Sequence, residues 1–200
     1  EGYVQMSENF QDTDYGVRYN VKSEIIKDFM LAVRENAKGA TTIDQKNEAI
    51  MRAIIDSRGH YDTEILDTVE TIYNEQATPE ERTAARQRLN QISQERPLDI
   101  ENRGKNHIVC TDVAAMFQLG REILGEPVYY VTGVCELEGH AWLIAPNNKL
   151  IDPTQLTIFE DGEEPSTTKV HENQIVHPAD FSQTIEFIKS GQPIIVQDEN

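Results

Sequence analysis

Several residue types that define structural classes are scarce in this chain of 200 residues. It has two cysteines, Cys110 and Cys135, which allow one disulfide but exclude a disulfide-rich scaffold. Neither cysteine belongs to a Cys-x-x-Cys pair, so we expect no structural zinc site, and no other pattern indicates a metal or a cofactor. No apolar run approaches the roughly 18 residues of a membrane span, so we do not expect the chain to cross a bilayer.

Positive charge is also scarce. The chain has 18 Lys and Arg against 35 Asp and Glu, which gives a formal net charge of −17. Phosphate binding needs a cationic surface, so nucleic acid is not the expected partner. A cationic peptide or protein would be attracted to this surface, although solubility alone explains the same excess. The first residues show no secretory signal pattern, but the chain does not begin with Met, so compartment and oligomeric state stay open.

The first half of the chain is predicted to be helical. Residues 1–20 lack a sustained period and are interpreted as an irregular lead-in. Four helical patterns follow, over residues 23–39, 41–59, 61–77 and from Thr78 to just before Pro97. The last has the clearest start, because Thr78, Pro79 and Glu81 match a capping box with proline at the first helical position. We expect these helices to pack on one another or on the second half.

The second half has a different pattern. Residues 110–124 predict a buried helix, and segments rich in Val, Tyr, Trp and Ile predict strands at 128–135, 140–145 and 149–152. A surface loop at 153–170, a helix at 179–190 and a last strand at 193–197 complete the expectation. The predicted fold class is α+β, with a helical region at 1–97 and a core at 98–200 in which a helix faces an antiparallel sheet.

Three residues of the second half have side chains that could form the catalytic triad of a cysteine enzyme, and they occur in the order cysteine, histidine, aspartate. Cys110 opens the predicted helix, where unpaired N–H groups and the helix dipole favour a thiolate. His140 lies in an apolar strand, where an imidazole needs a polar partner, and Asp152 ends the next strand. A thiol nucleophile needs a base, and the base needs a group that orients it. For Cys110 alone, a buried structural cysteine is the simpler alternative.

The triad hypothesis makes a prediction about strand register. Side chains alternate between the two faces of a strand, so register decides which residues share a face. A two-residue turn after Pro146 would put Asp152 on the face opposite His140. A three-residue connection, which pairs Ala145 with Lys149, puts both side chains on one face. The triad therefore requires a three- or five-residue connection, or a bulge.

A larger pattern resembles the core of the transglutaminase-like superfamily of papain-like cysteine enzymes. It consists of a cysteine that opens a helix, Gly133 late in a strand, the segment His140-Ala141-Trp142 and the segment Asp152-Pro153-Thr154. The resemblance covers residues 104–156, about a quarter of the chain. It implies that Cys110 is a nucleophile that forms a thioester with an amide substrate, that His140 is general base and acid, and that Asp152 orients the imidazole.

The family often has an arginine shortly before the strand glycine, where this chain has Val128-Tyr129-Tyr130. The four helices upstream match no domain of the family, and both departures leave the substrate open. We expect hydrolysis of a peptide or protein amide, by proteolysis or deamidation, rather than crosslinking, because no calcium-binding loop is present.

The backbone N–H of Cys110 is a natural oxyanion donor, and the side chain of Asn106 or His107 is a candidate for the second. Two alternatives remain. The acidic helical half could make the chain a non-catalytic protein-interaction module, or Cys110 and Cys135 could form a structural disulfide.

Overall fold

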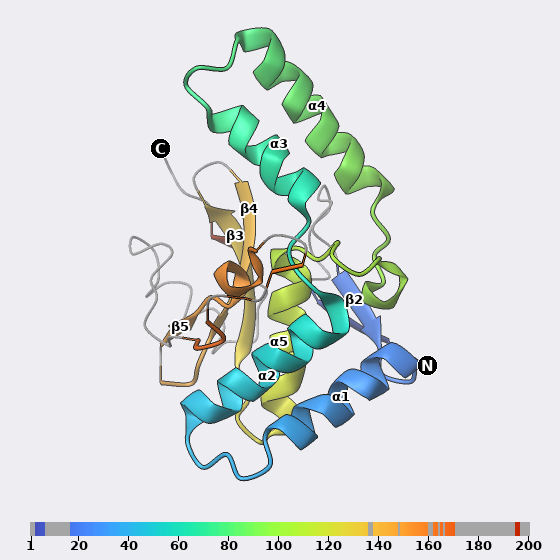
Figure 1. Cartoon of the computed structure of the whole chain (residues 1–200), viewed down its shortest axis with the longest axis vertical. Helices are drawn as coiled ribbons and strands as arrows, with labels where there is room; N and C mark the ends of the chain where they lie inside the picture. The colour runs from blue at the N-terminus through green and yellow to red at the C-terminus, as the bar shows by residue number, and fades with distance from the viewer. Residues whose placement is uncertain are drawn as a thin grey trace.

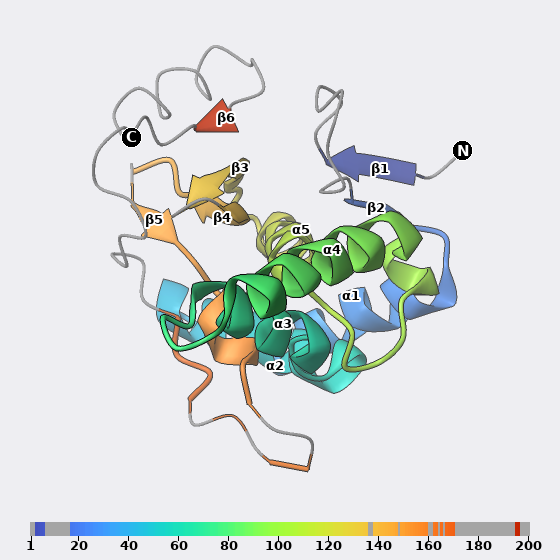
Figure 2. The same ribbon diagram turned by 90° about the horizontal axis from the view of Figure 1, so that it is seen from above.

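A computed structural model of the chain describes residues 3–6, 17–135, 138–147, 149–159, 162, 163, 165, 167–170 and 195–196. The fold class is α+β, as predicted: helices cover a small sheet (Figures 1 and 2). In chain order the elements are β1 (Tyr3–Met6), β2 (Val17–Asn20), α1 (Glu24–Asn36), α2 (Ile43–Arg58), α3 (Thr63–Tyr73), α4 (Pro79–Glu95), η1 (Ile100–Asn102), α5 (Cys110–Ile123), β3 (Tyr129–Cys135), β4 (Glu138–Ile144), β5 (Leu150–Ile151), η2 (Thr154–Thr157) and β6 (Ile195–Val196).

All four helices of the first half begin at a side chain that caps them. The expected N-cap of α1 is confirmed, because the Ser23 hydroxyl accepts a hydrogen bond from the N–H of Ile26 at 3.3 Å. The predicted capping box of α4 is also present: the Thr78 hydroxyl accepts from the N–H of Glu81 at 3.2 Å, and the Glu81 carboxylate accepts from the N–H of Thr78 at 2.8 Å. A second capping box, between Thr42 and Gln45, begins α2. These local bonds fix where the helices start.

The helices α1 and α2 pack against α5 and share its hydrophobic core. Their apolar stripes are fully buried, and α2 approaches α5 so closely at Gly120 that a Cβ there would lie 2.7 Å from Cγ2 of Ile50. The core also includes residues of β2, η1 and the sheet, so segments on both sides of position 97 contribute to it. We call β2, α1, α2, η1, α5 and the sheet the body. Its largest fully buried side chains are Phe29, Phe117, Ile26, Ile50, Met51, Ile54, Ile100, Ile108, Met116, Leu143, Ile144 and Ile151.

The helices α3 and α4 form an antiparallel pair that extends away from the body (Figure 1). They make their main contacts with each other, and Arg88 and Glu64 form an ion pair between them at 2.6 Å. Within α3 and α4, only Ile72 and Ala85 are buried. We call this pair, residues 63–95, the arm. The sequence left open whether the four helices pack on the second half of the chain or on one another, and the structure contains both arrangements. Helices α1 and α2 pack on the second half, and α3 and α4 pack on each other.

The sheet has the strand order β5-β4-β3-β6. Neighbours β5, β4 and β3 are antiparallel, as predicted, whereas β6 is parallel to β3. The long connection between β5 and β6 permits this, since a parallel neighbour needs a crossover of about a dozen residues or more. Helix α5 packs on β4 and β3. The helix expected at 179–190 lies outside the described residues, and the last strand is described at Ile195–Val196.

Two expectations are wrong. Residues 3–6 and 17–20, taken as irregular, form the antiparallel pair of β1 and β2, and Val17 and Tyr19 are buried. A strand of four residues is too short to show a recognisable alternation of apolar and polar side chains. In addition, β2 is held by a tertiary hydrogen bond from the N–H of Arg18 to the carbonyl of Leu98 at 3.0 Å. The expected surface loop begins instead with the helix η2, whose Thr154 and Thr157 are buried. In the described part of the chain no helix is both long and apolar enough to cross a membrane.

Candidate active site

Cys110 is the first residue of α5 and lies at the edge of the hydrophobic core. Its side chain is a free thiol, and the residue is only 5% exposed. The first N–H groups of an α-helix point toward this end and favour negative charge there. In α5 the N–H of Asp112 is already engaged, because it donates to the carbonyl of Val109 at 3.0 Å. The prediction that Cys110 opens a helix is confirmed, and the thiol is not in a disulfide.

His140 and Asp152 form a hydrogen-bonded pair on neighbouring strands. Nε2 of His140 lies 2.8 Å from Oδ2 of Asp152, while the second carboxylate oxygen, Oδ1, accepts from the N–H of Thr154 at 3.1 Å. His140 lies on β4 opposite Gly133 of β3, and Asp152 directly follows β5. Because both carboxylate oxygens are engaged, the Asp152 side chain is held in one orientation and fixes that of the imidazole.

The connection between β4 and β5 has the odd length that the triad requires. The N–H of Ala145 donates to the carbonyl of Lys149 at 2.8 Å, and Ile144 pairs with Leu150. Three residues therefore separate the paired positions Ala145 and Lys149. The register prediction is confirmed, and it explains why Asp152 lies on the same face as His140.

The environment of His140 favours its protonated form. Burial alone would lower the pKa of His140, but hydrogen bonds to Asp152 and Cys110, together with attraction from both negative charges, outweigh it and raise the pKa from 6.5 to about 11. Because Nε2 is occupied by Asp152, the other ring nitrogen is the one available to Cys110. The structure thus bonds His140 to Asp152, and Cys110 contributes to the raised pKa of the imidazole.

A second group of buried charges lies beside the thiol. The Asp112 carboxylate accepts from Arg103 and from the N–H of Val109 at 3.0 Å, which caps α5. Arg96 lies 3.5 Å from Asp112 and 3.6 Å from Asp62. Burial lowers the pKa of both guanidinium groups, and the attraction of Asp62 opposes this at Arg96. Cys110 is among the smaller contributions that raise the pKa of each arginine, which indicates that both lie near the thiol. Sequence reasoning missed both arginines, since neither belongs to a motif.

Two aromatic side chains near the triad carry buried polar atoms. Trp142 stacks on His140 with ring centroids 5.9 Å apart and an interplanar angle of 20°. The indole Nε1 of Trp142 and the hydroxyl of Tyr130 are buried and have no hydrogen-bond partner among the described residues. Sequence reasoning treated Trp142 as packing or as a wall beside the triad, and it named no role for Tyr130.

The two candidate oxyanion donors have other partners. The Oδ1 atom of Asn106 accepts from the N–H of His60 at 3.2 Å, and the residue adopts a positive φ of 65°. The side chain of His107 is 63% exposed, and its Nδ1 lies 3.1 Å from Oδ2 of Asp62. No contact of either side chain with Cys110 is found in the described part of the chain, so both remain untested candidates.

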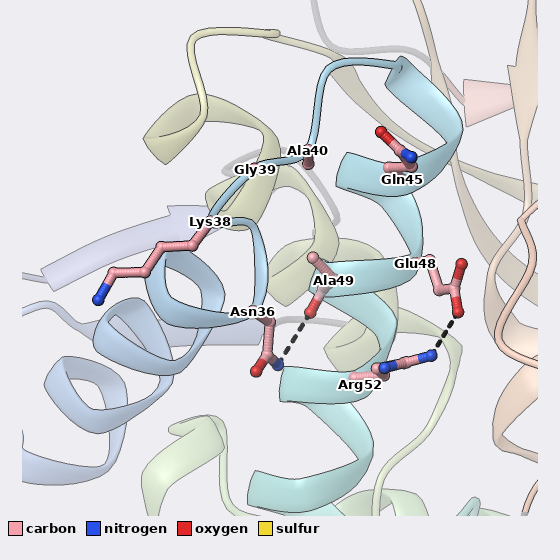
Figure 3. A pocket seen from close by; sticks show the side chains of 8 residues that line it. All are labelled: Asn36, Lys38, Gly39, Ala40, Gln45, Glu48, Ala49 and Arg52. Carbon is pink, nitrogen blue, oxygen red and sulfur yellow. Dashed lines mark hydrogen bonds and ion pairs between the residues drawn. The ribbon is translucent and has the colours of Figure 1, made fainter.

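A separate hollow of about 230 Å³ lies between the end of α1 and the start of α2 (Figure 3). It is lined by polar and charged side chains, including Glu48 and Arg52, which pair at 2.6 Å. None of its lining residues belongs to the triad. Across the described residues, no cluster of three or more His, Cys, Asp or Glu has the arrangement of a metal site.

Comparison with protein-family models, curated proteins and solved structures finds no match to this chain. The transglutaminase-like resemblance therefore stays a prediction that depends on the residues and geometry described above.

Proposed function

We propose that this chain is a cysteine-dependent amide hydrolase or acyltransferase that acts on peptide or protein substrates through a thioester at Cys110. The observation that carries the proposal is the hydrogen bond between His140 and Asp152, together with a buried free thiol at Cys110 that helps to raise the pKa of the imidazole. A structural cysteine needs neither an imidazole partner nor a carboxylate behind it. We further propose that α5 and the sheet form a transglutaminase-like core.

The geometry supports a two-step acyl transfer. The thiolate of Cys110 attacks the amide carbonyl carbon and forms a C–S bond, and the carbonyl electron pair moves onto oxygen. When this intermediate collapses, the C–N bond breaks and the departing amine takes a proton from His140. In the second step His140 accepts a proton from water as its oxygen attacks the thioester carbon; the C–S bond then breaks, which releases the acid and restores the thiolate beside the protonated imidazole. Asp152 keeps the imidazole oriented through both steps.

We favour hydrolysis over transfer to an amine, and a cationic substrate over an acidic one. The net charge of −17 attracts positively charged peptides and proteins and repels acidic ones. Hydrolysis is favoured because the sequence has no calcium-binding loop of the kind that would suggest a regulated crosslinker.

The rate of Cys110 alkylation by iodoacetamide as a function of pH tests the activated thiol. We expect the wild-type protein to react well below about pH 8, and His140→Ala to react only in the range of an ordinary thiol, whose pKa is about 8.5. His107→Ala removes an exposed histidine outside the triad and is the matched control, with an expected profile like the wild type. Peptide mass spectrometry separates Cys110 from Cys135.

An inert Cys110, or identical profiles for wild type and His140→Ala, contradicts the enzymatic function. The alternative of a non-catalytic interaction module would then be the better explanation, and the arm, with its few buried residues, would be the first surface to test.

A further inference from the structure

The indole ring of Trp142 lies against the imidazole ring of His140. The two residues are separated by one position on β4, so their side chains share a face of the sheet, whereas Ala141 and Leu143 belong to the opposite face and to the hydrophobic core. The ring centroids are 5.9 Å apart, and the two ring planes are inclined by only 20°. Trp142 therefore presents its π face, rather than its edge, to the imidazole.

This stacking contact does not compete with the hydrogen bonds of the imidazole. Hydrogen bonds to the two ring nitrogens lie near the plane of the ring, and in that plane Nε2 of His140 meets Oδ2 of Asp152 at 2.8 Å. The indole of Trp142 stacks on the ring instead of lying in its plane. The carboxylate and the aromatic face can therefore act on the same imidazole together.

Both rings are largely shielded from water. Trp142 is 3% exposed, and the side chain of His140 is 16% exposed. A cation within about 6 Å of the face of a tryptophan ring is attracted by its π electrons, and the attraction is stronger where water is excluded. A neutral imidazole lacks this charge attraction. The contact with Trp142 therefore favours the same protonated form of His140 that Asp152 favours.

We propose that Trp142 is a positioning residue of the active site: its indole face holds the imidazole of His140 in place and stabilises the protonated ring by a cation–π contact. The inference rests on the proposed function, in which protonated His140 gives its proton to the departing amine. Asp152 and Cys110 are the titratable groups that act on His140, and its partner on β3, Gly133, has no charge. The indole does not titrate, so its contribution is the same at every pH at which the protein is folded.

Trp142 is the only tryptophan of the chain, so a tryptophan analogue incorporated during expression changes this position alone. Fluorine withdraws π electrons from the indole face and leaves the shape of the ring almost unchanged. In full-length protein that contains monofluoro-, difluoro- or trifluorotryptophan, we expect the pKa of His140, measured by ¹⁵N NMR, to fall stepwise by up to about one unit. Because the thiol and the imidazole titrate as a pair, the step of the Cys110 alkylation profile at which the imidazolium loses its proton should move by the same amount.

Two substitutions give a second measurement. Trp142→Leu removes the aromatic face, so we expect the pKa of His140 to fall by about one unit, and Trp142→Phe, which keeps an aromatic ring, should recover part of that loss. Tyr129→Leu is the matched control, because Tyr129 is a 42% exposed aromatic residue of β3 that pairs with Ile144, four positions from His140. It should leave the pKa of His140 unchanged.

The proposal is overturned if the pKa of His140 is the same in all the fluorinated proteins, because packing depends on the shape of the indole and not on its π electrons. It is also overturned if Trp142→Leu and Trp142→Phe give the same pKa. The proposed function is judged separately. If Cys110 of the unlabelled wild type reacts as an ordinary thiol, that function fails, and the role of Trp142 in catalysis fails with it, even where the pKa of His140 follows the number of fluorines.

Discussion

The helix pairs α1–α2 and α3–α4 follow each other along the chain and start in the same way, with a side-chain cap on every helix and a capping box on α2 and α4. Their surroundings differ. In the first pair, Phe29, Val33, Ile50 and Ile54 are completely buried against α5. In the second pair the two helices pack mainly on each other, and Ile72 and Ala85 are their buried residues.

The comparison separates the signals that form a helix from the contacts through which that helix stabilises the fold. Caps and periodicity set the bounds of all four helices, whereas tertiary burial supplies most of the stability of a helix in a protein. The triad belongs entirely to the body. Among the described residues, the arm approaches the candidate site at its base, where Asp62 caps α3 and lies near Arg96 at the end of α4.

The largest effect is expected from Asp152→Asn in the body, compared with Asp67→Asn on the exposed side of the arm. Loss of the carboxylate frees the imidazole to adopt an unproductive orientation or tautomer, so acylation of Cys110 by 4-nitrophenyl acetate should slow by about 10²–10⁴-fold. Asp67→Asn should react as the wild type does. A comparable loss in Asp67→Asn would show that the arm takes part in the reaction.

The protonation of His140 sharpens the comparison between a carboxylate of the body and one of the arm. Because the folded protein raises the pKa of His140 from 6.5 to about 11, the charged ring contributes stability that is complete below pH 6.5 and is lost as pH rises through about 11. In ¹⁵N NMR titrations, we expect Asp152→Asn to lower the pKa of His140. Asp67→Asn on the arm should leave the pKa of His140 unchanged, and an unchanged pKa in Asp152→Asn would contradict the assigned cause.

Truncating a core residue tests where the stability lies. Phe29→Ala should lower the free energy of unfolding by about 3–5 kcal/mol, measured by urea denaturation, because it leaves a cavity among fully buried side chains. Leu31→Ala, on the same helix but 57% exposed, should cost less than about 0.5 kcal/mol. Ile72→Ala in the arm should lie between them; a cost equal to that of Phe29→Ala would mean that the arm and the body form one equally packed unit.

The two capping boxes give the prediction with the smallest expected effect on stability. Thr42→Ala and Thr78→Ala each remove the same bond, worth about 1 kcal/mol. In the body this loss should appear in global unfolding. In the arm it should appear as faster amide hydrogen exchange along α4, with little change in global stability. Equal global effects from both variants would show that the arm unfolds only with the body.

The sequence predicted the features that depend on neighbouring residues. The box at Thr78 and the helix that opens at Cys110 follow from local patterns, and the structure contains both. The odd connection before Lys149 was expected only as a requirement of the triad hypothesis, and it is also present. The short strand β2 was missed because its pairing comes from tertiary contacts. Arg96 and Arg103 were missed for a related reason, since only the folded chain brings them to the buried carboxylate of Asp112.

The three-residue connection between Ala145 and Lys149 has a consequence for how this segment tolerates insertions and deletions. Its residues can be exchanged, since their number rather than their identity sets the parity of the register. A deletion or insertion of one residue that moves the register by one turns Asp152 away from His140, whereas a change of two restores the alternation. In a library of variants of this connection, Cys110 should therefore react in those with an odd number of residues and not in those with an even number. Single substitutions cannot test this dependence, because they do not change the length.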